Sequence, residues 1–155
     1  MNAELDRIDR RLLQELQRDG RIANAELAVR VGLSESACLR RVKALEKSGV
    51  ISRYVAVLDP ARVGLGTSFL VRLTLNRQTD RDFAAFEEQV RTVPEVMECY
   101  LTTGSSDYVL RVVARDAADF ERLHSRVLTK LPGVARVESS FVLRPVVQLV
   151  GLHLG

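Results

Sequence analysis

The sequence predicts an α+β protein in two parts: a helical part of helix-turn-helix type, then a ferredoxin-like βαββαβ α/β sandwich. Three observations predict this. Apolar residues recur with helical spacing in the first part. After Gly66 they alternate with polar residues, which is the period of a strand. The elements of the second part then follow the order strand, helix, strand, strand, helix, strand.

Three helices are predicted in the first part. The apolar stripe of the first helix, which ends at Gly20, consists of Leu5, Ile8, Leu12 and Leu16. Asn24 is expected to cap a short second helix. Gly32 interrupts the pattern, and Ser34 is expected to cap a third helix that runs to about Ser48.

A β segment and a linker are predicted next. Val50 to Leu58 is rich in β-forming residues, and Asp59-Pro60 is expected to stop the strand. Residues 59–66 contain one proline and two glycines, which favours a linker. The predicted divisions are therefore 1–58, a linker at 59–66, and 67–155.

The second part is predicted to contain four strands and two helices. Gly104-Ser105-Ser106 joins the second and third strands as a hairpin. The strands are expected from Phe69 to Leu75 and at 96–103, 107–114 and 134–143, and the helices at 80–91 and 116–130.

Apolar residues are expected on both faces of this sheet, although two helices can cover only one face. A second subunit is expected to cover the other face, so an oligomer is predicted. The residues assigned to this second face are Leu70, Tyr100, Leu101, Val109 and Val113.

Composition excludes several functional classes. No apolar run approaches the roughly 20 residues of a membrane span, and the N-terminus does not resemble a signal peptide, so a cytoplasmic protein is expected. Cys38 and Cys99 are predicted to be reduced core thiols. His124 and His153 are far apart and have no nearby ligand partners, which argues against a metal site or a histidine-based enzyme.

The third helix is predicted to have one apolar face and one cationic face. Residues 1–65 contain 12 basic and 9 acidic residues, whereas the remaining chain is neutral, which points to a polyanion partner. A helix of this kind fits the major groove, and Arg40 is suited to a guanine edge. The candidate DNA contacts are Asn24, Ser34, Ser36, Arg40, Arg41, Lys43 and Lys47.

These residues also resemble the leucine-responsive regulatory protein/AsnC (Lrp/AsnC) family of transcription regulators. In the first part, the resemblance rests on LDRIDRRLL (5–13), NAELA (24–28), VGLS (31–34), CLRRVKALE (38–46), GVI (49–51) and LDP (58–60). In the second part, it rests on GSSDY (104–108), LPGV (131–134) and SFVL (140–143). The match covers nearly the whole chain.

The resemblance implies a winged helix-turn-helix DNA-binding domain at 1–58 and an effector-binding and oligomerisation domain at 67–155. It further implies dimers formed through the sheets, commonly assembled into octamers or related rings, and an amino-acid effector bound between dimers. Neither the effector nor the operator is identified by the resemblance.

The hairpin loop is the candidate effector site. Its backbone N–H groups suit a carboxylate, and Asp107 offers a counter-charge for an α-ammonium group, although Asp107 alternatively serves only to bond its own loop. Residues 137–140 are expected to complete the pocket from another subunit. The candidate effector contacts are Thr102, Thr103, Gly104, Ser106, Asp107, Tyr108, Val137, Ser139 and Ser140.

The sequence therefore predicts a cytoplasmic, nucleoid-associated regulator that binds specific double-stranded DNA and whose DNA binding or assembly is modulated by an amino acid. No catalytic residue, metal or cofactor is expected. Two alternatives stay open: a DNA-bending architectural protein without a ligand, and a small-molecule-binding ferredoxin-like module whose helical part only oligomerises. Equal affinity for cognate and random duplexes would favour the first, and absence of duplex binding the second.

Overall fold

The computed structural model describes residues 5–147 and 151–154. Contacts divide the chain into a helical unit, made of residues 1–57 and 146–155, and a sheet unit, made of residues 58–145. This division differs from the predicted one at two places. Residues 58–66 belong to the sheet unit, where the backbone N–H of Leu65 donates to the carbonyl of Pro60. The C-terminal segment belongs to the helical unit instead of the sheet unit.

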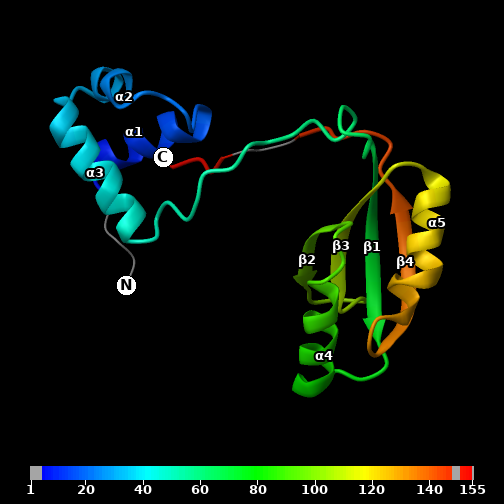
Figure 1. Ribbon diagram of the computed structural model, residues 1–155. Helices are drawn as coiled ribbons and strands as arrows, with labels where there is room; N and C mark the ends of the chain where they lie inside the picture. The colour runs from blue at the N-terminus through cyan, green and yellow to red at the C-terminus, as the bar shows by residue number, and fades with distance from the viewer. Residues whose placement is uncertain (1–4, 148–150, 155) are drawn as a thin grey trace. The chain divides into compact units, whose positions relative to one another are not determined.

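The helical unit contains the three predicted helices, α1 (Arg7–Arg18), α2 (Asn24–Val31) and α3 (Glu35–Lys47) (Figure 1). Ser34 caps α3 as predicted, because its hydroxyl accepts a hydrogen bond from the N–H of Ala37 at 3.3 Å. The helices pack around one cluster of buried side chains, which contains Leu12, Leu13, Leu27, Ala28, Val31, Cys38 and Leu45.

Two predictions for this unit were wrong. Asn24 is not the cap of α2; Ala23 holds that position, and the Asn24 amide instead donates to the carbonyl of Glu35 at 2.9 Å. The segment from Val50 to Leu58 forms no strand. A β segment needs a partner for its backbone groups, and no other described segment of this unit pairs with it, so its β propensity is not expressed.

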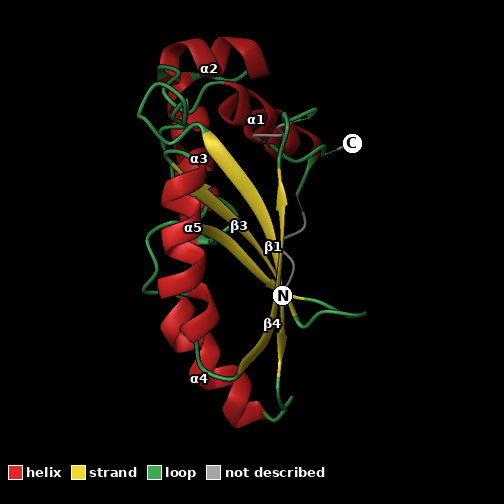
Figure 2. Ribbon diagram, turned by 90° about the vertical axis from the view of Figure 1, so that its right-hand side faces the viewer, coloured by secondary structure: helices red, strands yellow, loops and turns green. Residues whose placement is uncertain are grey.

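The sheet unit has the predicted element order, with four antiparallel strands arranged β2-β3-β1-β4. Figure 2 shows both helices, α4 and α5, on the same side of the sheet. The fold is therefore the ferredoxin-like βαββαβ sandwich. The elements are β1 (Thr67–Leu75), α4 (Asp80–Val90), β2 (Val96–Leu101), β3 (Tyr108–Ala114), α5 (Ala117–Arg126), a 3-10 turn (Leu128–Lys130) and β4 (Val134–Phe141).

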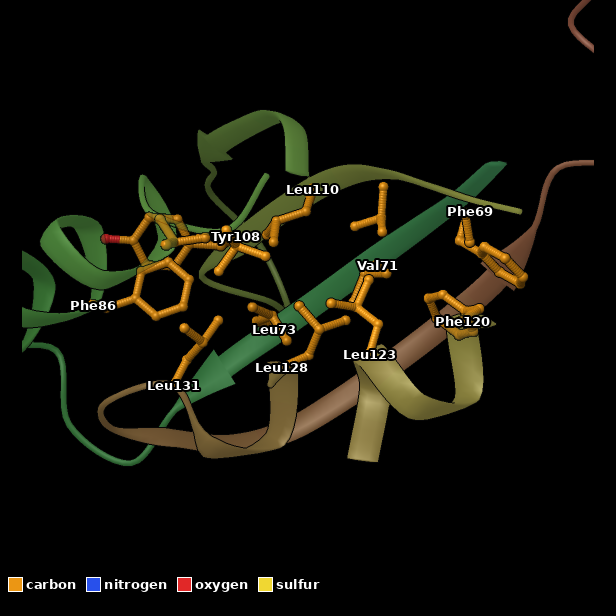
Figure 3. Close-up of a cluster of buried hydrophobic side chains, with 14 of the residues drawn as sticks. Phe69, Val71, Leu73, Phe86, Tyr108, Leu110, Phe120, Leu123, Leu128 and Leu131 are labelled. Atoms are coloured by element: carbon orange, nitrogen blue, oxygen red, sulfur yellow. The ribbon is translucent and has the colours of Figure 1, made fainter. Parts of the chain in front are cut away.

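The core of the sheet unit lies between the sheet and these helices (Figure 3). Alternate residues of β1 are buried there, as the strand period predicted. The predicted helix at 116–130 is interrupted, because Val127 leaves the helical conformation (φ −120°, ψ −66°). This break turns Leu128 fully into the core, while Val127 is half-buried against it.

The open face of the sheet, turned away from α4 and α5, is only partly apolar. Leu70 and Tyr100 are exposed there, at 38% and 56%. The prediction was wrong for Leu101, which pairs with the buried Tyr108 and so belongs to the helix-covered side of the strand pair. Val113 lies on the open face as predicted, since it pairs with Ser68, but it is buried within the chain.

Candidate functional site

The outer face of α3 is an exposed polar and cationic surface. Ser36, Arg40, Lys43 and Lys47 are exposed, while Cys38 and Leu45 on the opposite side are buried. Within residues 5–147 and 151–154, no carboxylate pairs with any of these three cations. Their charges are therefore available to an external polyanion such as duplex DNA.

Arg41 behaves differently from its neighbour Arg40. Its guanidinium contacts Asp6 at 2.7 Å and Asp9 at 2.8 Å. The hydrogen bonds that the Arg41 guanidinium donates to these two carboxylates raise the pKa of Arg41. The Asp9 backbone N–H and the Arg41 guanidinium lower the pKa of Asp6. Arg41 thus joins α3 to the start of α1, and no signal in the sequence of α3 alone distinguishes it from Arg40.

Asn24 and Ser34, two further candidate DNA contacts, both act on the start of α3. Asn24 bonds the carbonyl of Glu35, and Ser34 caps the helix. Both therefore help to fix the angle and origin of α3, which are the properties that place a recognition helix in a groove.

The candidate effector loop, residues 102–107, is closed by its own hydrogen bonds. The N–H of Thr102 donates to the carbonyl of Asp107 at 2.8 Å, and the hydroxyl of Thr102 donates to the carbonyl of Ser106 at 3.1 Å. Gly104 adopts φ +116°, which side-chain-bearing residues rarely adopt. Within the described chain, the N–H groups at 103–106 donate to no protein acceptor, so they can hold an anion.

The side chain of Asp107 is bonded to the sheet and not to its own loop. Its carboxylate accepts a hydrogen bond from the N–H of Leu75 at 2.7 Å, and its N–H donates to the carbonyl of Leu73 at 2.9 Å. The strand β1 therefore fixes the position of this carboxylate. Only one carboxylate oxygen is used in this way within the described residues, so the other remains available for a ligand.

Two candidate effector contacts prove to be core residues. Tyr108 is 1% exposed, packs against Phe86 with ring centroids 4.3 Å apart, and donates its hydroxyl to Glu87 at 3.0 Å (Figure 3). Val137 is half-buried against the same core. The sequence does not reveal this burial, because an aromatic residue beside a polar loop has the same sequence appearance whether its ring turns inward or outward.

The candidates on β4 do not meet the loop within one chain. Ser139 pairs with Val71 and Ser140 with Leu70, whereas the loop bonds β1 at the other end of that strand, near Leu73. Strand β1 also lies between β4 and the β2–β3 hairpin. Thr103 and Ser140 are exposed, so both are accessible to a second subunit.

Two surface hollows lie outside the loop. One of about 370 Å³ adjoins the start of α4 and is lined by Arg77, Thr79, Arg81, Asp82 and Ala85. The other, of about 190 Å³, lies between α4 and β2 and is lined by Val90, Arg91, Val96, Met97, Glu98 and Cys99. Burial raises the pKa of the Cys99 thiol to about 11, which leaves it mostly protonated and unreactive near neutral pH.

None of the described helices is long and apolar enough to cross a membrane.

Replacing Tyr108 with phenylalanine is expected to lower the free energy of unfolding by about 1 kcal/mol at pH 8, because the hydrogen bond to Glu87 is lost. Burial raises the pKa of Tyr108 above its ordinary value near 10. Above pH 10 the unfolded wild-type chain releases a proton that the folded chain keeps, so wild-type stability falls there. Urea unfolding at several pH values should show the difference between wild type and Y108F shrinking above pH 10. A constant difference would contradict the raised pKa.

Family comparisons agree with this geometry. Residues 5–52 match the family of winged helix-turn-helix DNA-binding domains, and residues 68–152, more than half of the chain, match the Lrp/AsnC ligand binding domain. The chain belongs to the Lrp/AsnC family. This Lrp/AsnC regulator therefore carries an N-terminal DNA-binding domain and a C-terminal ligand-binding domain, as the sequence resemblance implied.

Individual relatives match the Lrp/AsnC regulator along most of its length. It is 44% identical to the Bkd operon transcriptional regulator of Pseudomonas aeruginosa, over 93% of this chain and 94% of that protein. It also resembles the structure of the transcriptional regulator NMB0573 of Neisseria meningitidis in complex with L-methionine (TM-score 0.92, 39% identity, 97% of each chain). A feast or famine regulatory protein of M. tuberculosis, complexed with L-methionine, matches with a TM-score of 0.85 and 36% identity, over 93% of this chain and 95% of that chain.

Proposed function

We propose that this regulator binds specific double-stranded DNA through the outer face of α3, and that an amino acid bound at the 102–107 loop modulates its DNA binding or assembly. The observation that carries the DNA proposal is the exposed row of Arg40, Lys43 and Lys47, whose charges no described carboxylate neutralises. The side chains near the start of α3, Ser36 and Arg40, are assigned to base edges, and Lys43 and Lys47 to phosphates.

The effector proposal rests on complementary groups in one loop. A free amino acid carries a carboxylate and an ammonium group; the N–H groups at 103–106 suit the first, and the Asp107 carboxylate suits the second. The two similar regulators solved with L-methionine support an amino acid as the ligand class. Ser139 and Ser140 complete the site in this proposal, but from another subunit, since β1 separates them from the loop in their own chain.

We propose that the protein is a homo-oligomer whose dimer forms through the open face of the sheet, with higher assembly into octamers or related rings. Leu70 and Tyr100 are exposed at the centre and edge of that face. Arg111 and Glu98 form an ion pair of 2.8 Å within the chain on the same face, so this part of the face carries no unpaired charge between these two groups. We place this assembly on the nucleoid in the cytoplasm, where its DNA partner lies.

Calorimetric titration of the full chain with L-methionine, and then with the other common amino acids, tests the effector proposal. An amino acid that binds should do so through both of its charged groups. L-Methioninol, which keeps the ammonium group and lacks the carboxylate, is therefore the matched control and should bind at least about 10-fold more weakly. Equal affinity for methionine and methioninol would show that the loop N–H groups do not bind the ligand carboxylate.

Fluorescence anisotropy with a duplex taken from upstream of the regulator's own gene, and with a random duplex, tests the DNA proposal. Affinity for both should fall as salt is raised from about 50 to 200 mM, because released counterions drive binding. The specific duplex should bind more tightly throughout. Equal affinities would favour the architectural alternative over a sequence-specific regulator.

A further inference from the structure

The C-terminal segment 151–154 lies against α1 of the helical unit (Figure 1). The Gln17 side chain pairs with the backbone of Leu152 at two points. Its amide N–H donates to the Leu152 carbonyl at 3.0 Å, and its amide oxygen accepts from the Leu152 N–H at 2.5 Å. Two residues further along the segment, the carbonyl of Leu154 accepts a hydrogen bond from the Arg10 guanidinium at 2.7 Å. These three bonds recognise main-chain atoms, so they hold the segment in one register on α1.

Side-chain packing selects the same register. Leu154 packs on the buried cluster of the helical unit, whereas the Leu152 side chain is 76% exposed and turns away from it. Gly151 lies so close to α1 that a Cβ atom there would sit 2.8 Å from the Gln17 amide oxygen and 3.0 Å from its Cβ. A side chain at position 151 would therefore push Gln17 out of its pairing with Leu152. Apolar packing of Leu154, the main-chain hydrogen bonds of Leu152 and the close approach of Gly151 to Gln17 thus all favour the same docked position.

We propose that residues 151–154 form a docking strap that fastens the C-terminal end of the chain to α1, so that the DNA-binding domain is held at both of its connections to the ligand-binding domain. The chain leaves the helical unit after α3 and re-enters it after β4. A domain that is connected at a single point samples more orientations than a domain that is connected at two points. Docking therefore lowers the entropy cost of presenting two recognition helices to two half-sites, a consequence that rests on the proposed dimeric DNA binding.

Amide hydrogen exchange of the full chain, without DNA or ligand, tests the docking itself. In the C-terminal peptide of the wild type, the Leu152 amide should exchange on the order of 10-fold more slowly than in an unstructured peptide, and Gly151→Ala should remove this protection. Leu152→Ala is the matched control, because it keeps the clamped backbone and alters only an exposed side chain, so its protection should persist. Unprotected exchange of this peptide in the wild type would overturn the proposal.

Duplex binding tests the consequence. Gly151→Ala should weaken binding to the specific duplex by about 3- to 10-fold and leave random-duplex affinity unchanged, because the strap restrains orientation without touching DNA. Gln17→Ala should act in the same direction, and it creates no steric clash. If a variant loses the exchange protection of the strap but binds the specific duplex as tightly as the wild type, the strap does not restrain the DNA-binding domain. Absence of duplex binding by the wild type would instead contradict the proposed function, while the exchange measurement would still decide the docking.

Discussion

Replacing Asp107 with asparagine is expected to weaken binding of the amino-acid effector by at least about 30-fold, because the ligand ammonium loses its counter-charge in a partly desolvated site, a loss of about 2 to 5 kcal/mol. The substitution keeps an amide oxygen that can still accept from the Leu75 N–H. The loop should therefore keep its position, and DNA binding without effector should persist. Calorimetry with the amino acid that binds the wild type measures the change.

Asp107→Ala separates the two roles of this carboxylate. Alanine removes the charge and also leaves the half-buried Leu75 N–H without its acceptor, so the free energy of unfolding should fall by about 1 to 3 kcal/mol in addition to the loss of ligand affinity. If the asparagine variant binds the effector with an unchanged dissociation constant, Asp107 has only its structural role. The ligand would then have to sit elsewhere.

Replacing Arg40 with alanine is expected to weaken binding to the specific duplex by about 1 to 3 kcal/mol, roughly a 5- to 150-fold change, with a much smaller effect on random DNA. The physical reason is that a bidentate contact to a base edge is lost. Arg40 is exposed and lies opposite the buried Cys38, so the truncation leaves no cavity and the thermal midpoint should not change.

Lys47→Ala is the matched control on the same helix face. Lys47 lies further from the start of α3, so it is assigned to phosphates, and its loss should weaken binding to specific and random duplexes by similar factors. It should also reduce the slope of affinity against salt. The reverse ranking, with Lys47 controlling specificity and Arg40 acting uniformly, would mean that α3 enters the groove by its other end.

The sequence alone determined the order of elements and most of the core. Phe69, Val71, Leu73 and Leu75 are buried as the strand alternation predicted, because a two-residue period assigns faces without any knowledge of the partner strand. The cap at Ser34 and the cationic face of α3 were predictable for the same reason: both depend on residues within a few positions of one another.

Only the tertiary structure decided which polar groups are already engaged within the chain. Arg40 and Arg41 are neighbours of the same type, yet Arg41 is held by Asp6 and Asp9, about 30 positions away in sequence. Asp107 likewise bonds Leu75 of another strand. The strand expected from Val50 to Leu58 did not form because no partner strand lies beside it in the described chain, and propensity cannot supply one. Local pattern fixes periodicity and the cap at Ser34. Hydrogen-bond partners distant in sequence, such as the Glu35 carbonyl that engages Asn24, depend on how the elements pack.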